Sequence, residues 1–273
     1  TRNSSSFLVR FFAINRSEKR GRLKANYHTH TKRCQHAEGE DREYVEAAIE
    51  AGYEILGFAD HCPWIFPDGY ISNVRMRTSE VEGYFVSLES LRKEYERDIT
   101  ILIGFEAEYF PPLIEAQDEL LKDYPLDYMI LAQHFMSRDG KKCYAGSETD
   151  SVEMLKHYVD LCIGGMQTGR YKYLAHPDLI HYVGDSAIYE KEMKRLCEAM
   201  KENNVPLEMN ILGLLTGRNY PDGRFWDIAK TVGNRAIIGM DAHTPEQLSN
   251  PNYVEKAKLL CEGMEIIEKL EIK

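Results

Sequence analysis

The sequence lacks any apolar run long enough to cross a membrane, which takes about 20 residues. The most apolar early stretch, Phe7–Ile14, is interrupted by Arg10. It also lacks the length and cleavage site of a secretory signal. The six cysteines are dispersed through 273 residues without a CxxC pair, so neither a disulfide framework nor a thiol redox motif is indicated. We therefore expect a cytoplasmic protein without a membrane partner.

An excess of positive charge is also missing. The chain has 34 basic and 44 acidic residues, for a net charge of −10, which opposes adhesion to nucleic acid. We expect no nucleic-acid partner, and a phosphate site in this chain would need a local source of positive charge. The apolar fraction of 43% and the charged fraction of 29% are those of ordinary globular proteins and exclude a wholly disordered chain.

No Pro/Gly/Ser-rich linker divides the chain after Leu23. Residues 1–21 are rich in Ser, Arg and Lys and show no clear period, so we interpret them as an N-terminal extension. The remaining residues, 22–273, are enough for one large core. The simplest prediction for them is a single domain.

The rest of the chain alternates short apolar runs with helix-length amphipathic segments. The expected strands are Lys24–Tyr27, Ile55–Ala59, Ile101–Phe105, Tyr128–Ala132, Tyr173–Ala175, Leu207–Met209 and Ala236–Met240. The expected helices are Asp41–Ala51, Ser79 to about Arg97, Val152–Ile163, Ser186–Asn203 and Val254–Leu270. Such alternation predicts an α/β protein with a parallel sheet, either open or closed as a barrel.

Six of the seven expected strands end in side chains that can bind a metal. These are His28 and His30, Asp60 and His61, Glu106 and Glu108, His134, His176 and Asp178, and Asp241 and His243. In a closed barrel all of these ends meet at one rim, whereas in an open sheet they would be spread apart. Their distribution therefore favours a closed barrel.

Imidazoles combined with carboxylates suit Zn, Mn or Fe better than Mg or Ca. A single open site needs about three protein ligands, and the strand ends, together with His36 in the first loop, offer too many for one ion. The residues therefore indicate two or three divalent ions with a bridging carboxylate. Such a cluster would give this acidic chain the cationic pocket that a phosphate dianion needs.

Several of these segments resemble the PHP (polymerase and histidinol phosphatase) superfamily. The resemblance lies in NYHTHT, CxHxxG at Cys34–Gly39, GFADHCP, GFEAEY, QHF, AHPD and GMDAH, between about Ala25 and Glu246. The proline after His61 and the run from Glu208 to Pro221 are similar, more narrowly, to bacterial histidinol-phosphate phosphatases. One departure is Ala59, where the family often has Ser or Thr.

The resemblance implies a distorted (β/α)7 barrel, similar to a TIM barrel, with three divalent metal ions (Zn, Mn and/or Fe). Carried over by position, the ligands would be His28, His30, Glu106 and Asp241 for one ion, Glu106, His134 and His176 for a second, and His36, His61 and His243 for a third. A hydroxide bridging the first two ions would attack phosphorus. The catalytic residues implied are Glu106, Asp241 and His243.

The resemblance further implies hydrolysis of a small-molecule phosphate ester, L-histidinol phosphate, to L-histidinol and phosphate in histidine biosynthesis. The basic residue that would bind the substrate phosphate is predicted at Arg218, in preference to Arg170, Lys172 or Arg224. The alternatives are a PHP-type phosphoesterase acting on another ester, such as a phosphotyrosine or a nucleotide, and a noncatalytic metal-stabilised module.

Four residues beside the expected ligands are not assigned as ligands in this interpretation. Glu108 would hold a ligand side chain in place. Asp60 should point to the opposite side if its strand persists, with a supporting role as the alternative. Cys34 and Cys62 would be small buried residues and not thiolate ligands.

Overall fold

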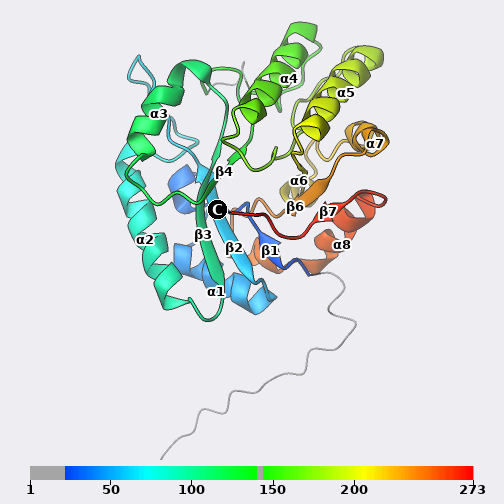
Figure 1. Cartoon of the computed structure of the whole chain (residues 1–273). Coiled ribbons are helices and arrows are strands. Elements are labelled where there is room, and N and C mark those ends of the chain that lie inside the picture. The colour runs from blue at the N-terminus through cyan, green and yellow to red at the C-terminus, as the bar shows by residue number, and fades with distance from the viewer. Residues whose placement is uncertain (1–21, 140–143, 273) are drawn as a thin grey trace, which may run out of the picture.

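The computed structural model describes residues 22–139 and 144–272. The expected extension over residues 1–21 lies outside the described residues. The strands are β1 (Ala25–Asn26), β2 (Ile55–His61), β3 (Thr100–Ala107), β4 (Tyr128–Leu131), β5 (Leu207–Asn210), β6 (Ala236–Gly239) and β7 (Ile266–Ile267), and every strand pair is parallel (Figure 1). The α/β class with a parallel sheet is therefore confirmed.

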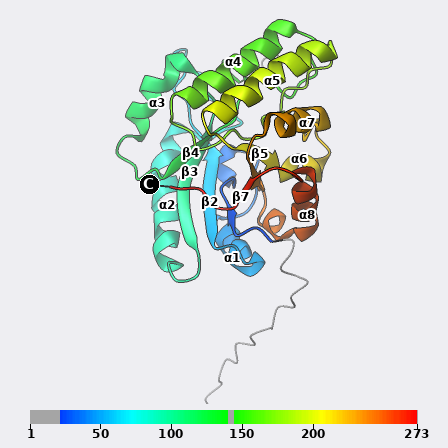
Figure 2. The same ribbon diagram turned by 45° about the vertical axis from the view of Figure 1, so that its right-hand side comes forward.

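The helices lie around the outside of the strands, as the two ribbon views show (Figures 1 and 2). They are α1 (Asp41–Ala51), α2 (Val81–Glu94), α3 (Ile114–Leu121), α4 (Val152–Gln167), α5 (Ser186–Glu202), α6 (Ile211–Thr216), α7 (Gly223–Val232) and α8 (Pro251–Leu260). In the described part of the chain, no helix combines the length and the apolarity that crossing a membrane requires.

Hydrogen bonds between the strands close the curled sheet into a distorted barrel. The sheet β1-β2-β3-β4 and the sheet β5-β6-β7 are joined through Leu174, which bridges Leu131 on one side and Leu207 on the other. On the opposite side Thr29 pairs with Ala242, and the His30 backbone N–H donates to the Ala242 carbonyl at 2.9 Å. The predicted barrel is thus confirmed, with three of its strand contacts reduced to single bridges.

Two sequence predictions were wrong in detail. The segment Tyr173–Ala175 contributes only the bridge at Leu174 rather than a full strand. The helix expected over Val254–Leu270 is α8, which ends at Leu260, and β7 follows it. Gly263, with φ of 88°, turns the chain between them, and a left-handed residue of this kind ends a helix whatever the apolar period beyond it.

The inside of the barrel is filled by three buried tyrosines, Tyr27, Tyr128 and Tyr173. The Tyr128 hydroxyl donates toward the carbonyls of Tyr27, at 2.8 Å, and Phe58, at 3.0 Å. A Cβ at either Gly57 or Gly104 would overlap the Tyr128 side chain. The absence of a side chain at these two strand glycines therefore leaves space for the Tyr128 ring inside the barrel.

Candidate metal centre and active-site cavity

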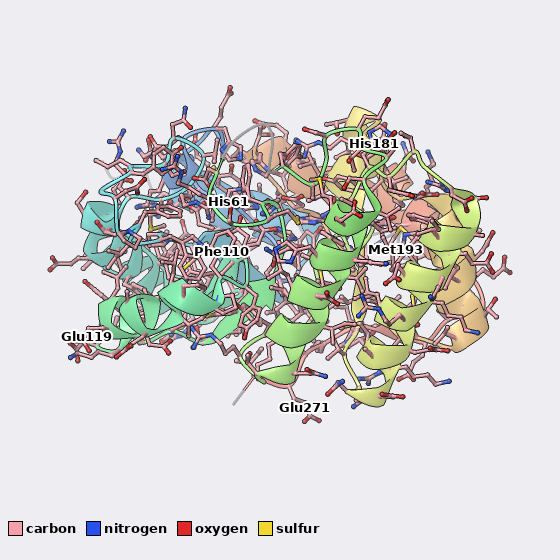
Figure 3. The ribbon with its side chains drawn as sticks, turned by 90° about the horizontal axis from the view of Figure 1, so that it is seen from above. His61, Phe110, Glu119, His181, Met193 and Glu271 are labelled. Atoms are coloured by element: carbon pink, nitrogen blue, oxygen red, sulfur yellow. The ribbon has the colours of Figure 1, made fainter. Side chains whose placement is uncertain are left out.

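The nine predicted ligands come together at the carboxyl ends of the strands. They follow or end β1, β2, β3, β4, the Leu174 bridge and β6, apart from His36, which lies in the loop after β1 (His28, His30, His36, His61, Glu106, His134, His176, Asp241 and His243). Seen from above, His61 lies inside the ring of helices, whereas Glu119 and Glu271 lie at its outer edge (Figure 3). The convergence follows from barrel closure, which brings all strand ends to one rim.

Glu106 lies at the centre of the group. Its carboxylate oxygens are 2.8 Å from His61 Nδ1, 2.9 Å from His176 Nε2, 3.1 Å from His28 Nε2, 3.5 Å from His134 Nε2 and 3.6 Å from His30 Nε2. One buried carboxylate therefore reaches five imidazoles, as a ligand shared between ions must.

Asp241 is a second carboxylate in the group. Its Oδ1 lies 3.1 Å from His30 Nε2, 3.4 Å from His243 Nδ1 and 3.5 Å from His28 Nε2. It is joined to Glu106 through the two imidazoles of the HxH motif, which face both carboxylates.

His36, His61 and His243 form a third group. One nitrogen from each lies within 4.8 Å of the others. The His36 ring centroid is 4.9 Å from that of His243 and 5.1 Å from that of His61. Three imidazoles around a point partly open to solvent match the ligand number of an open site.

Unpartnered polar atoms show that these groups fit cations. His28 Nε2, His30 Nε2 and Glu106 Oε2 are buried. Each lies close to other polar atoms of the group, but within the described residues none of the three has a partner in hydrogen-bond geometry. Ligand atoms of these same three residues lie within 4.8 Å of one another. Buried polar atoms left unpaired are costly, and a divalent cation is the group that would satisfy all three together.

The buried carboxylates of the group attract positive charge. Burial opposes protonation of His28 and His30, but contacts with neighbouring groups, chiefly the carboxylates, raise the pKa of both well above the ordinary value, so a bound cation would replace those protons. Burial alone would raise the pKa of Glu106, but His134, His28 and His61 hold that pKa well below its ordinary range. Burial likewise opposes ionisation of Asp241, yet His28 and other neighbouring imidazoles lower its pKa well below its usual value. Both carboxylates are therefore anionic. Burial, reinforced by His30, lowers the pKa of His243 to about 3, so this imidazole has its lone pair free.

Two ligands have a backbone conformation that side chains rarely adopt. His176 has φ of 26° and Asp241 has φ of 52°. Left-handed backbone at non-glycine residues costs of order 1–3 kcal/mol and clusters at functional sites. At both positions the chain turns sharply as it leaves the barrel, and the turn aims the side chain inward.

Glu208 and Asn210, on β5, hold three of these ligands from below. Glu208 Oε1 lies 2.8 Å from His28 Nδ1, and Glu208 Oε2 accepts the His176 backbone N–H at 3.1 Å. Asn210 Nδ2 donates to Asp241 Oδ2 at 3.1 Å. The sequence interpretation gave neither residue a role, although a glutamate inside an otherwise apolar strand was a usable signal.

The wall on the β3–β4 side is built around Arg75, another residue that the sequence interpretation missed. Arg75 is buried and donates to both oxygens of Glu108, at 2.9 and 3.1 Å, and to Asp139. Glu108 Oε1 in turn lies 3.3 Å from His134 Nδ1. Glu108 thus orients His134, as the supporting role predicted for it requires.

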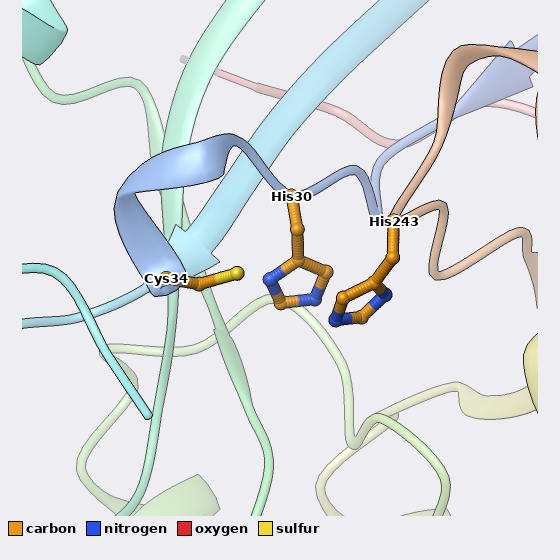
Figure 4. Close-up of side chains that lie close together, drawn as sticks. All are labelled: His30, Cys34 and His243. Carbon is orange, nitrogen blue, oxygen red and sulfur yellow. The ribbon is translucent and has the colours of Figure 1, made fainter. Parts of the chain in front are cut away.

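Asp60, Cys34 and Cys62 lie next to the ligands, and Asp60 faces His30 rather than the opposite side of its strand, which was the sequence expectation. Asp60 Oδ1 is 3.5 Å from His30 Nδ1, and the Cys34 sulfur points toward the His30 ring, which stacks on His243 (Figure 4). Burial raises the pKa of the thiols of Cys34 and Cys62. Burial thus favours the neutral thiol at both positions. Cys34 Sγ nevertheless lies within 4.8 Å of a ring nitrogen of His30 and of one of His243, so the prediction that Cys34 is not a ligand stays a prediction.

A cavity of about 500 Å³ opens above this group. Tyr144, Arg218 and Tyr220 line this cavity together with six of the nine expected ligands, which are His36, His61, His134, His176, Asp241 and His243. Arg170 pairs with Asp118 and Arg224 pairs with Asp222. Of the four basic residues compared in the sequence, Arg218 is the one in the cavity wall.

Comparison with known proteins places this geometry in a family. The model of the PHP domain matches residues 26–211, more than half of the chain. The chain belongs to the PHP domain family. It is 26% identical over 227 residues to the probable histidinol-phosphatase of Deinococcus radiodurans, covering 81% of this chain and 86% of that protein. It is 25% identical over 271 residues to the histidinol-phosphatase of Bacillus subtilis, covering 86% and 98%.

A solved structure has the same fold. The histidinol phosphate phosphatase of Lactococcus lactis, complexed with zinc, L-histidinol and phosphate, aligns with a TM-score of 0.68 at 19% identity, covering 91% of this chain and 99% of that one. The alignment supports the distorted barrel described above.

Proposed function

We propose that the protein is a metal-dependent phosphomonoesterase that hydrolyses L-histidinol phosphate to L-histidinol and phosphate. The observation that carries the proposal is the convergence of nine ligand-type side chains beneath a cavity whose wall presents Arg218. The names of the Deinococcus and Bacillus relatives and the ligands of the Lactococcus structure support this substrate.

The proposed cofactors are three divalent ions drawn from Zn, Mn and Fe. Their ligand sets are His28, His30, Glu106 and Asp241; Glu106, His134 and His176; and His36, His61 and His243. The five contacts of Glu106 support a shared carboxylate between the first two sets. When bound, such ions lower the pKa of water to roughly 7 and neutralise phosphoryl oxygens.

The residues of the chain then divide the work. Glu106 and Asp241 supply the anionic charge that fixes the centre, and Asp241 would also orient the attacking water through a hydrogen bond. His243 would be the third catalytic residue, as a ligand of the third ion. Arg218 would bind the phosphate, since its guanidinium is a donor fork suited to phosphate oxygens.

Residues 22–273 would act as one phosphoesterase domain, and the small phosphate ester would be its partner in the cytoplasm. The described cysteines support this compartment because all of them are free thiols, as is usual in a reducing environment.

The test is a comparison of kcat/KM for L-histidinol phosphate, p-nitrophenyl phosphate and a nucleotide monophosphate with one metal-loaded preparation. We expect histidinol phosphate to have the highest value by orders of magnitude. A higher value for another ester would make the protein a PHP-type phosphoesterase of different specificity. Stabilisation by metal without hydrolysis of any ester would make it a noncatalytic module.

A further inference from the structure

On the basis of the proposed function, we infer that the Tyr220 hydroxyl is a second donor to the phosphoryl group of the substrate, acting beside Arg218. Both residues line the cavity. Tyr220 would thus be a substrate-binding residue contributed by the segment after α6.

The first support is the direction of the hydrogen bond between the two side chains. Arg218 Nη1 donates to Tyr220 Oη at 3.0 Å. The phenol oxygen therefore accepts from the guanidinium, and its own hydrogen has no acceptor within the described residues. A phenol has one O–H to donate, and here that donor lies at the wall of the cavity.

The second support is the charge of Arg218. Within residues 22–139 and 144–272 the Arg218 guanidinium forms no ion pair with a carboxylate. It contacts the hydroxyl and the ring of Tyr220, which is neutral. Arg75, which lines the cavity from the opposite wall, is neutralised by the carboxylates of Glu108 and Asp139. A cavity-lining cation that keeps its charge favours an anionic ligand.

The third support is that Tyr220 is held firmly in place. Its side chain is buried, and its ring centroid is 5.6 Å from that of His176. Gly213 passes so close that a Cβ there would overlap both the Tyr220 carbonyl and the Tyr220 ring. The Arg218 backbone N–H also donates to the Gly213 carbonyl at 3.2 Å, so one short segment fixes both donors.

Chemically, the pair matches a phosphate monoester dianion. Its terminal oxygens accept hydrogen bonds, and a guanidinium fork with an adjacent phenol offers donors from one side. Hydrogen bonds to charged groups are stronger than those between neutral groups, so the loss of the phenol donor should be measurable in phosphate binding.

The test uses Tyr220→Phe, which removes the hydroxyl and keeps the ring beside His176. We expect the dissociation constant of inorganic phosphate, measured by calorimetry on the metal-loaded full chain, to rise roughly tenfold. KM for the ester should rise with it, while metal content and the midpoint of thermal unfolding stay unchanged. The control is Tyr53→Phe, since the Tyr53 hydroxyl donates to the Leu248 carbonyl outside the cavity.

Two further variants keep the inference falsifiable. Gly213→Ala leaves the hydroxyl present but displaces the ring, and it should weaken phosphate binding as well. In the double variant of Tyr220→Phe with Arg218→Gln, the loss should be smaller than the sum of the single losses, because Arg218 positions the phenol.

Unchanged phosphate affinity in Tyr220→Phe, or a change that tracks lost metal, would overturn the inference. Failure of the proposed function is a separate result. If p-nitrophenyl phosphate is hydrolysed and histidinol phosphate is not, the substrate proposal fails, yet weaker phosphate binding in Tyr220→Phe would still support the role of the phenol.

Discussion

Two arginines face the same cavity and differ in almost every physical respect. Arg75 is 2% exposed and enclosed by Glu108 and Asp139. Arg218 is exposed, and its side chain meets the phenol of Tyr220. The buried arginine is fully compensated, whereas the exposed one retains a charge directed at the cavity.

The difference teaches which arginine builds the site and which one is free to bind. A buried charge must be paired to be tolerated, so Arg75 is committed to the wall and to the position of His134 through Glu108. Arg218 has no such commitment and can exchange water for a phosphate oxygen. The same type of side chain thus holds the structure in one wall, and in our proposal it would recognise the phosphate from the other.

The largest expected effect comes from removing one of the two carboxylates at the base of the cavity, between the walls that carry Arg75 and Arg218. Asp241→Ala or Glu106→Ala should abolish turnover, because each removes an anionic ligand that several imidazoles face. The measurement is kcat on L-histidinol phosphate with metal analysis of the same samples. Near-native activity in both variants would contradict the assignment of these carboxylates to the metal centre. The two arginines would then not flank a catalytic site.

Next in size is the structural arginine. Arg75→Met leaves two buried carboxylates without a counter-charge and should lower the free energy of unfolding by about 3–5 kcal/mol. Denaturant unfolding measures this, with Arg218→Met as the matched control that should change stability by about 0.5 kcal/mol or less. Equal losses in the two variants would show that the arginines do not differ as described.

The binding arginine should show the opposite signature. Arg218→Gln should raise KM for the ester by roughly 10–100-fold, because a charged hydrogen bond to phosphate is lost, and leave the unfolding transition in place. Steady-state kinetics and thermal unfolding of one preparation check both parts. An unchanged KM would exclude Arg218 from the phosphate site.

The smallest expected effect is on metal affinity and concerns Glu108, the carboxylate between Arg75 and His134. Glu108→Gln keeps the size of the residue but removes the charge facing His134, and should weaken zinc binding by about tenfold. Competition with a chromogenic chelator gives the dissociation constant, and Glu43→Gln on the outer surface of α1 provides the control. If both variants bind zinc like the unaltered protein, Glu108 does not act through His134.

Much of the barrel could be predicted because its signals are local. The helix over Asp41–Ala51 was predicted at its observed bounds, since Gly52, with φ of 84°, ends it. The barrel followed from the placement of metal-type side chains at strand ends. The short β7 was missed because the apolar period continues past Leu260, although Gly263 is a local signal that the helix ends before it.

The site was predictable in its candidate ligands, in Glu108 beside His134 and in the placement of Arg218 at the cavity. Glu106, His134 and Asp241 lie at strand ends, and parallel closure alone brings them together. The partners of Arg75 lie 33 and 64 residues away in sequence, at Glu108 and Asp139. No local pattern records such a pairing, so the distinction between the two arginines needed the three-dimensional structure.

The most direct test of the central claim is reconstitution of the chelated protein with a divalent metal, following the rate of L-histidinol phosphate hydrolysis. The convergence of nine ligand-type side chains predicts that the rate returns only after more than one equivalent of metal per chain is bound. Full activity with one equivalent or without metal, or no hydrolysis at any loading, would contradict it.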